Sequence, residues 1–125
     1  MHLPEDAELL RIFIGESDRH GHQPLYEAIV LLARRHGMAG ATVLRGIMGF
    51  GADSRLHTAK ILRLSEDLPI VIEIVDRPER IDELLAEMDP MIEEGLITRE
   101  RARVIKYRPH GKSPDASRQP DSPIT

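Results

Sequence analysis

Asp67-Leu68-Pro69-Ile70-Val71-Ile72-Glu73-Ile74-Val75-Asp76 is the stretch of sequence that decides the fold. From Ile70 to Val75 it is a run of β-branched residues interrupted only by Glu73, which is typical of a strand. Asp76 and Pro78 follow immediately and have the residue types found where helices begin. We therefore predict a strand over 70–75 that passes directly into a helix.

The elements after this strand follow from spacing and helix breakers. Helical spacing places the apolar residues of the second helix on one face, and Pro90 is expected to bend or end that helix. Leu96-Ile97 is expected to begin a last strand, which Arg103 to Tyr107 carries on. The apolar stripe of the helix consists of Ile81, Leu84, Leu85 and Met88.

The N-terminal half shows the same succession of elements. Leu9 to Ile14 alternates as a strand does and ends at Gly15, and residues 16–22 are polar and loop-like. A helix is expected from Pro24 to about His36, with Gly37 supplying a left-handed residue after its end. Ala41 to Met48 is expected to form the next strand, and Ile61 to Leu64 a short one.

The predicted order is β-α-β-β-α-β, which gives a ferredoxin-like α+β sandwich with two helices on one face of an antiparallel sheet. Residues 1–8 read as a polar leader and 9–108 as one folded domain. Residues 109–125 contain four prolines and three serines with few apolar residues, so we expect a disordered tail.

Composition excludes several classes of protein. The chain of 125 residues has a net charge of −4, whereas a general nucleic-acid binder needs a basic surface. It has no cysteine, which excludes disulfides and zinc–thiolate sites. No apolar run is long enough to cross a membrane, and the acidic N-terminus is unlike a signal peptide, so we expect a cytoplasmic protein.

The predicted strands are apolar on both faces. Leu9 and Phe13 alternate with apolar residues of strand 9–14, and Val71 and Val75 do the same in strand 70–75. Because the helices cover one face, a monomer would expose the other. Self-association through that face is therefore expected.

Four segments together resemble the DUF190 family of PII-like signalling proteins. They are the run from Gly37 to Gly51, Ile14-Gly15-Glu16-Ser17-Asp18, Gln23-Pro24-Leu25-Tyr26, and the run from Asp67 to Asp76. The resemblance extends from about Leu9 to Tyr107.

This resemblance implies a homotrimer that binds an adenine nucleotide (AMP, ADP or ATP) in clefts between subunits, without catalysis. A loop between the second and third strands, here residues 49–60, would report the ligand to a regulated partner, in some PII-like proteins a membrane transporter. The chain departs from PII proteins proper at Asp76-Arg77-Pro78-Glu79, where their glycine-rich phosphate loop would lie. It also lacks the loop tyrosine that PII proteins use for covalent modification.

The candidate nucleotide-binding residues lie around the base of that loop. Arg45 can clamp a phosphate with its guanidinium, and the backbone from Gly46 to Gly51 can donate N–H groups. The alternatives are a bulge at the glycines and, for Arg45, an exposed edge position or an ion pair with Glu73. The full candidate set is Gly15, Glu16, Arg45, Gly46, Gly49, Phe50, Gly51 and His57.

Two other interpretations remain open. Glu16, Asp18, His20 and His22 could hold a divalent metal ion, as in a metal-responsive, CutA-like trimer of the same fold. The second is a small hydrolase or transferase that acts on a nucleotide, for which the sequence offers no nucleophile–base motif, P-loop or Rossmann fingerprint. Glu73 is the carboxylate expected to be partly buried, as a structural or ligand-contact group.

Overall fold

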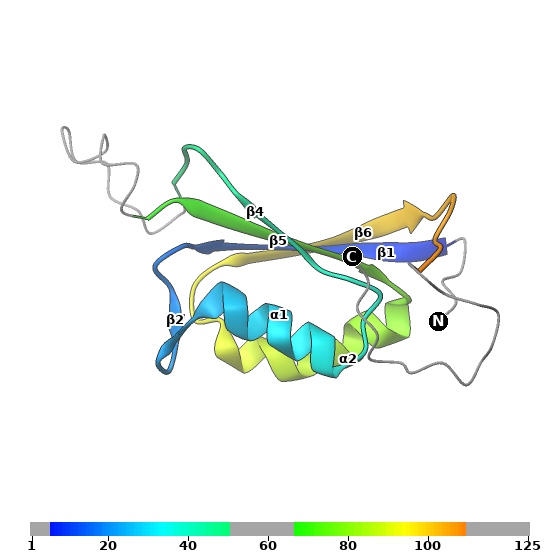
Figure 1. Cartoon of the computed structure of the whole chain (residues 1–125), viewed down its shortest axis with the longest axis horizontal. Coiled ribbons are helices and arrows are strands. Elements are labelled where there is room, and N and C mark those ends of the chain that lie inside the picture. The colour runs from blue at the N-terminus through cyan, green and yellow to red at the C-terminus, as the bar shows by residue number, and fades with distance from the viewer. Residues whose placement is uncertain (1–5, 51–66, 110–125) are drawn as a thin grey trace.

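The computed structural model describes residues 6–50 and 67–109, which form one layer of sheet and one layer of helices (Figure 1). The elements in chain order are β1 (Asp6–Gly15), β2 (Arg19–His20), β3 (Gln23–Pro24), α1 (Leu25–Arg35), β4 (Thr42–Arg45), β5 (Pro69–Asp76), α2 (Pro78–Met88), the 3₁₀ helix η2 (Asp89–Met91) and β6 (Leu96–Arg103).

The four long strands form an antiparallel sheet in the order β4-β5-β1-β6. Both helices lie against the same face of it (Figure 1). This arrangement confirms the predicted βαββαβ ferredoxin-like fold. β1 is central, because β5 pairs with one of its edges and β6 with the other.

The core lies between the sheet and the two helices. Every second residue of β5 from Ile70 onward is buried, as the period of two in a strand requires. The same alternation buries Leu10, Ile12 and Ile14 of β1. The helices contribute Leu25, Ala28, Ile29, Leu32 and Ala33 from α1 and Ile81, Leu84 and Met88 from α2.

The predicted helix signals are confirmed. Pro24 directly precedes α1, and Gly37 after its end has a φ of 69°, which favours glycine. Pro78 occupies the first turn of α2, and the regular helix stops before Pro90, where the chain tightens into η2.

Several boundaries differ from the expectation. β4 spans Thr42–Arg45 and does not extend to Met48. β1 begins at Asp6 rather than at Leu9, because its first residues pair with the end of β6. β6 ends at Arg103, opposite Asp6, so the expectation that the strand runs to Tyr107 is wrong. The segment expected to be a loop at 16–22 contains a short hairpin of β2 and β3. The strand expected at Ile61–Leu64 lies outside the described residues, as do residues 110–125.

The sheet face opposite the helices is here called the open face. Its central positions are Leu9, Arg11, Phe13, Val71, Glu73 and Val75, each only partly buried in this single chain. Within residues 6–50 and 67–109, no helix combines the length and the hydropathy needed to span a bilayer.

Candidate functional site

Six of the sequence-predicted site residues fall within the described chain, and five of them surround the end of the sheet where β1 and β4 stop. Gly15 and Glu16 lie at the end of β1, and Arg45, Gly46 and Gly49 at or just after the end of β4. We call this region, with Asp67–Pro69 at the start of β5, the loop-base corner. Phe50 is largely exposed beyond it, and Gly51 and His57 lie outside the described residues.

The glycines of the loop-base corner are required by close packing. A Cβ on Gly46 would lie 2.6 Å from Pro69 Cγ, and one on Gly49 would lie 3.1 Å from the same atom. The Gly46 N–H donates to the Pro69 carbonyl at 2.7 Å, which holds the chain against the proline ring. Neither glycine has a positive φ. Contact with Pro69 therefore explains both residues without a ligand.

Arg45 is held by Glu16 and not by Glu73. Its NH2 lies 2.5 Å from Glu16 Oε2, and the Arg45 side chain is 59% exposed. The predicted alternative of an Arg45–Glu73 ion pair is wrong, because Glu73 instead accepts a hydrogen bond from Arg11. A phosphate that reached Arg45 would have to displace a carboxylate.

The turn at Gly15–Asp18 adds further negative charge to the loop-base corner. Asp67 Oδ1 accepts hydrogen bonds from the backbone N–H of Ser17 at 3.0 Å and from its hydroxyl at 2.9 Å. Asp18 Oδ2 accepts one from the Gly15 N–H at 2.9 Å. Within the part of the corner that the structure describes, the carboxylates of Glu16, Asp18 and Asp67 lie together with the guanidinium of Arg45. The corner is therefore less suited to a phosphate than the sequence indicated.

A cavity of about 880 Å³ lies elsewhere, on the open face where β1 and β4 begin and β5 and β6 end. Pockets that hold small ligands have volumes of about 300–1,000 Å³. None of the six described candidate nucleotide-binding residues lines it, whereas Glu73, predicted from the sequence as a structural or ligand-contact group, does. Its lining residues are Leu9, Ala39, Gly40, Ala41, Thr42, Glu73, Val75, Ala102, Arg103, Val104, Ile105, Lys106 and Tyr107.

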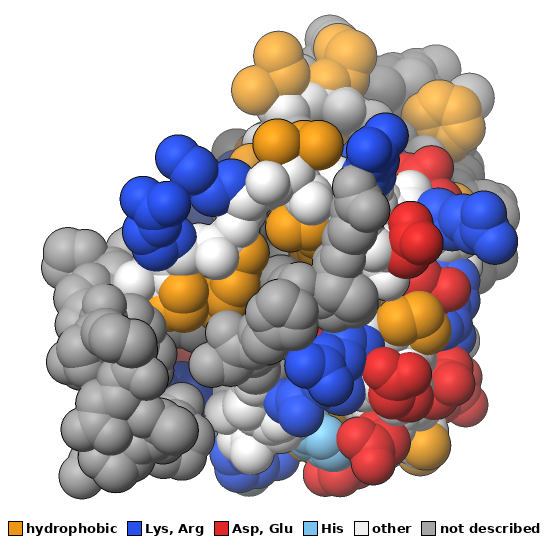
Figure 2. All heavy atoms as spheres, turned by 90° about the vertical axis from the view of Figure 1, so that its right-hand side faces the viewer, with side chains coloured by type: hydrophobic (Ala, Val, Ile, Leu, Met, Phe, Trp, Pro, Cys, Tyr) orange, Lys and Arg blue, Asp and Glu red, His pale blue; other side chains and the backbone are white. Residues whose placement is uncertain are grey.

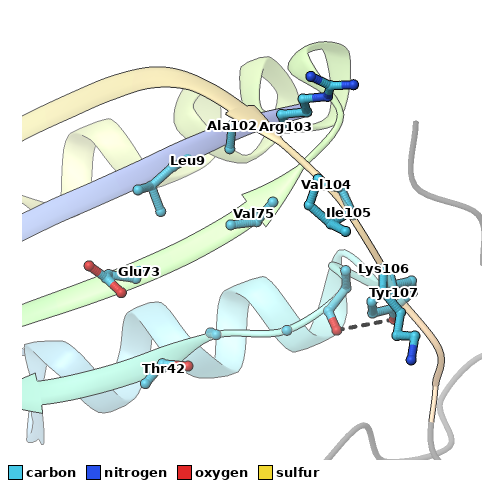
Figure 3. Close-up of a pocket in the computed structure, with 13 residues that line it drawn as sticks. Leu9, Thr42, Glu73, Val75, Ala102, Arg103, Val104, Ile105, Lys106 and Tyr107 are labelled. Atoms are coloured by element: carbon cyan, nitrogen blue, oxygen red, sulfur yellow. Dashed lines mark hydrogen bonds between the residues drawn. The ribbon is translucent and has the colours of Figure 1, made fainter. Parts of the chain in front are cut away.

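One wall of the cavity is the sheet itself. Leu9 and Val75 are directly paired there and provide an apolar surface. Thr42 is paired with Glu73 across β4 and β5, so a hydroxyl and a carboxylate lie side by side on the same wall. Figure 3 shows Leu9, Val75, Glu73 and Thr42 along three neighbouring strands.

Arg11 fixes the carboxylate of that wall. Its Nε lies 2.9 Å from Glu73 Oε2, and its NH1 lies 2.7 Å from Glu100 Oε1 on β6. The hydrogen bond to Glu73 is the main cause of a raised Arg11 pKa. Glu73 is therefore held in place by this ion pair at the cavity, with 31% of its side chain exposed. The expectation of a partly buried carboxylate is confirmed.

The opposite wall is the segment Val104–Pro109, here called the C-terminal strap. It leaves the end of β6 and passes Val104 and Ile105 to reach Tyr107 beside the turn before β4 (Figure 3). The Tyr107 hydroxyl donates to the Ala39 carbonyl at 3.4 Å. Burial raises the pKa of Tyr107, and the negative charge of Asp76 adds to the effect.

Cations line the cavity beside these apolar groups. Lys106 comes from the C-terminal strap and Arg103 from the end of β6. Figure 2 looks onto this end of the molecule and shows hydrophobic side chains between groups of Lys and Arg side chains. The combination of apolar walls, hydrogen-bonding groups and cations suits a flat ring that carries an anionic group.

Sequence reasoning missed the cavity for a physical reason. Its sheet wall is made of ordinary strand residues, and its outer wall exists only because the C-terminal strap crosses the sheet. A signal was present in Ala39-Gly40-Ala41, whose small side chains leave room in front of β4, and in the cation and aromatic of Lys106-Tyr107.

The predicted metal set is not assembled in the described chain. His20 and His22 are exposed in the β2–β3 hairpin. Over residues 6–50 and 67–109, no group of three or more His, Asp or Glu side chains is arranged to hold a metal ion. His36, at the end of α1, pairs instead with Glu87 of α2 at 3.0 Å.

Comparison of the sequence with known families gives a match to DUF190, described as "Uncharacterized ACR", over residues 7–104. A UPF0166 protein of Aquifex aeolicus is 38% identical over 98 residues, which cover 78% of this chain and 92% of that protein. A UPF0166 protein of Methanocaldococcus jannaschii is 37% identical over 92 residues, covering 73% and 84%.

Solved structures with the same fold include PII-like proteins. CPII of Thiomonas intermedia K12, bound to ADP and bicarbonate, superposes with a TM-score of 0.60 at 20% identity, covering 81% of this chain and 90% of that one. CPII bound to ADP, AMP and acetate gives 0.59 at 19% identity, with the same coverage. A PII-like signaling protein of Thermus thermophilus gives 0.54 at 17% identity, covering 80% and 90%. These likenesses confirm the fold.

Proposed function

The chain belongs to the DUF190 family and has the PII-like fold, and from this premise we propose that it is a non-catalytic regulatory protein that binds an adenine nucleotide. The observation that carries the proposal is the cavity of about 880 Å³ on the open face, with an apolar wall, a hydroxyl–carboxylate pair and lysine in its lining. CPII, which has the same fold, has been crystallised with ADP and AMP.

The cavity has a group for each part of such a ligand. Leu9 and Val75 offer an apolar surface for the base. The Glu73 carboxylate accepts hydrogen bonds and the Thr42 hydroxyl can donate or accept, so the pair suits an exocyclic amino group. Lys106 brings positive charge for a phosphate. We propose that the nucleotide lies here, and that the loop-base corner is its second, less favourable location, because Glu16 already neutralises Arg45.

Self-association through the open face is part of the proposal. Leu44 and Leu96 are 48% and 56% exposed in the single chain, at the edge strands that flank this face. A second copy packed there would cover both and would close the cavity from the side that is open to solvent. We propose a homotrimer whose clefts between subunits contain the ligand. Its loop at 49–60, of which residues 51–60 lie outside the described residues, would signal occupancy to a regulated partner protein.

Calorimetric titration tests the ligand and its location together. We expect one of AMP, ADP, ATP and cyclic AMP to bind at about one per chain, measured with and without magnesium. Thr42→Val and Lys106→Ala should each weaken binding about tenfold, as expected for loss of a hydrogen bond or charge contact. Arg101→Ala, which removes an exposed cation outside the cavity lining, should not.

Arg45→Ala separates the two locations. Unchanged affinity supports the cavity, whereas lost affinity with normal binding by the Thr42→Val and Lys106→Ala variants supports the loop-base corner. No heat with any nucleotide, from a protein shown to be folded and associated, contradicts nucleotide binding. Release of phosphate or AMP from ATP in the same samples contradicts the non-catalytic part of the proposal.

A further inference from the structure

The C-terminal strap is a wall of the cavity without being part of the sheet. Val104, Ile105, Lys106 and Tyr107 all line the cavity, yet β6 has ended at Arg103. Asp6 and Arg103 form the last pair of this ladder, and among the described residues no residue of Val104–Pro109 belongs to a strand. The strap therefore covers the cavity without the backbone pairing that fixes the other walls (Figure 3).

The attachment of the strap is weak. Among the described residues, Val104–Pro109 has one hydrogen bond, from Tyr107 to the Ala39 carbonyl, and its length of 3.4 Å exceeds the usual range of about 2.5–3.0 Å for a bond donated by a hydroxyl. Ile105 is 84% exposed, so it contributes little burial. Segments with few buried contacts and few protected hydrogen bonds open at low free-energy cost.

The point of attachment, by contrast, is rigid. The Ala39 N–H donates to Asp76 Oδ2 at 2.8 Å, and Asp76 is completely buried. Arg80 Nε lies 3.3 Å from Asp76 Oδ1, an electrostatic contact without the alignment of a hydrogen bond. Arg80 NH2 also donates to the carbonyls of His36 and Gly37, at 2.7 Å each. The turn that receives Tyr107 is thus tied to α1, β5 and α2.

A weakly held segment that lines one side of a cavity and is attached to a rigid support can act as a latch. We propose that the C-terminal strap is a latch on the cavity, with the Tyr107 hydroxyl as the group that holds it closed. In the homotrimer proposed above, where a second copy covers the side of the cavity that is open to solvent, the strap opens before a ligand enters or leaves, and the Tyr107–Ala39 bond limits how often this happens. The effect of the latch on ligand association and dissociation rests on the proposed nucleotide function, whereas the opening of the strap does not.

Hydrogen–deuterium exchange of the ligand-free full chain tests the opening. Tyr107→Phe keeps the ring and removes the hydroxyl. Loss of one such hydrogen bond should speed exchange of the amides of Val104–Arg108 about 2- to 10-fold, with the amides of β1 and β5 unchanged. Tyr26→Phe is the matched control, because it makes the same chemical change on α1, and it should leave strap exchange unchanged. Equal strap exchange in the wild type and Tyr107→Phe overturns the proposal.

Binding kinetics test the role of the latch, with whichever of AMP, ADP and ATP the wild type binds. Tyr107→Phe should raise both the association and the dissociation rate, with Kd changed by less than about twofold, because the bond restrains the free and bound states alike. A weaker Kd with an unchanged association rate would show that Tyr107 is a ligand contact, and would overturn the latch. A wild type that binds no nucleotide contradicts the proposed function, while the exchange experiment still decides whether the strap opens.

Discussion

Tyr107 shows how one hydroxyl can connect distant parts of a small domain. It lies 68 positions from Ala39 in the sequence, and its bond to the Ala39 carbonyl requires the protonated phenol as donor. Burial, followed by the nearby charge of Asp76, raises the pKa of Tyr107 above the ordinary value of 10.0. The folded chain therefore keeps this donor to a higher pH than the unfolded chain does.

The sign of the effect on stability follows from that shift. Because the pKa of Tyr107 is higher in the folded state, the contribution of the protonated phenol to the free energy of unfolding is fully present below about pH 10. This contribution is lost as the pH rises through the pKa that Tyr107 has in the folded state. We expect the tyrosinate absorbance of a Tyr26→Phe protein to appear at higher pH in buffer than in urea. Coincident titration curves would contradict a buried phenol. The chain has two tyrosines, so this variant reports Tyr107 alone.

Other single residues could be interpreted from the sequence to different extents. The left-handed Gly37 follows from a local rule about helix ends, and Glu73 was identified because a carboxylate within a β-branched run is unusual. The sequence suggested Glu73 as an ion-pair partner of Arg45, whereas the structure pairs Arg45 with Glu16. The choice between them depends on which strand ends meet in space.

At the scale of elements, β4 depends on the fit of its ends to neighbouring strands. It has four residues, all exposed, and among the described strands it pairs with β5 alone. The contact of Gly46 with Pro69 sets the point at which the chain leaves the sheet. A side chain at Gly46 would have to displace the proline ring or the strand.

Alanine substitutions at the two glycines that flank β4 test the importance of the contact between Gly46 and Pro69. Gly46→Ala should destabilise the chain by about 1–3 kcal/mol, as overpacked sites do. Gly40→Ala is the control, because a Cβ there meets nothing within 4 Å, and it should change the free energy of unfolding by less than about 1 kcal/mol. Urea denaturation measures both. Equal effects of the two substitutions would exclude the Pro69 contact as the cause.

The elements that sequence predicted well are those whose signals are local. β1 and β5 alternate over enough residues to define a face, and Pro24, Pro78 and Pro90 mark helix ends. The end of β6 was placed too late because it is set by β1, about 90 positions earlier. The cavity was missed for the same reason, since its outer wall depends on where the chain goes after that pairing ends.

For the whole molecule, the open face is the surface that a single chain leaves incomplete. Leu9, Phe13, Val71 and Val75 surround the Arg11–Glu73 ion pair, with both charged side chains about one-third exposed. The apolar positions favour burial against a second copy. The ion pair would require polar partners there, which restricts the geometries of association.

Introducing one negative charge on the open face tests whether the chains associate through it. Phe13→Glu should lower the molar mass measured by light scattering, because a carboxylate would be buried in the interface without a partner. Leu31→Glu introduces the same charge at an exposed apolar position of α1, on the helical side, and should leave the mass unchanged. A wild-type protein that is monomeric, or a Phe13→Glu protein of unchanged mass, contradicts association through the open face.

The central position of β1 has a consequence for the synthesis of the protein. β1 is translated early, but one of its edges is completed by β5 and the other by β6, with Asp6 paired to Arg103. On a ribosome, the nascent chain would therefore carry β1 with an unpaired edge until residues 96–103 have emerged. Unpaired strand edges expose backbone groups to association with other chains. A stalled or prematurely terminated product is thus the form of this protein most dependent on chaperones.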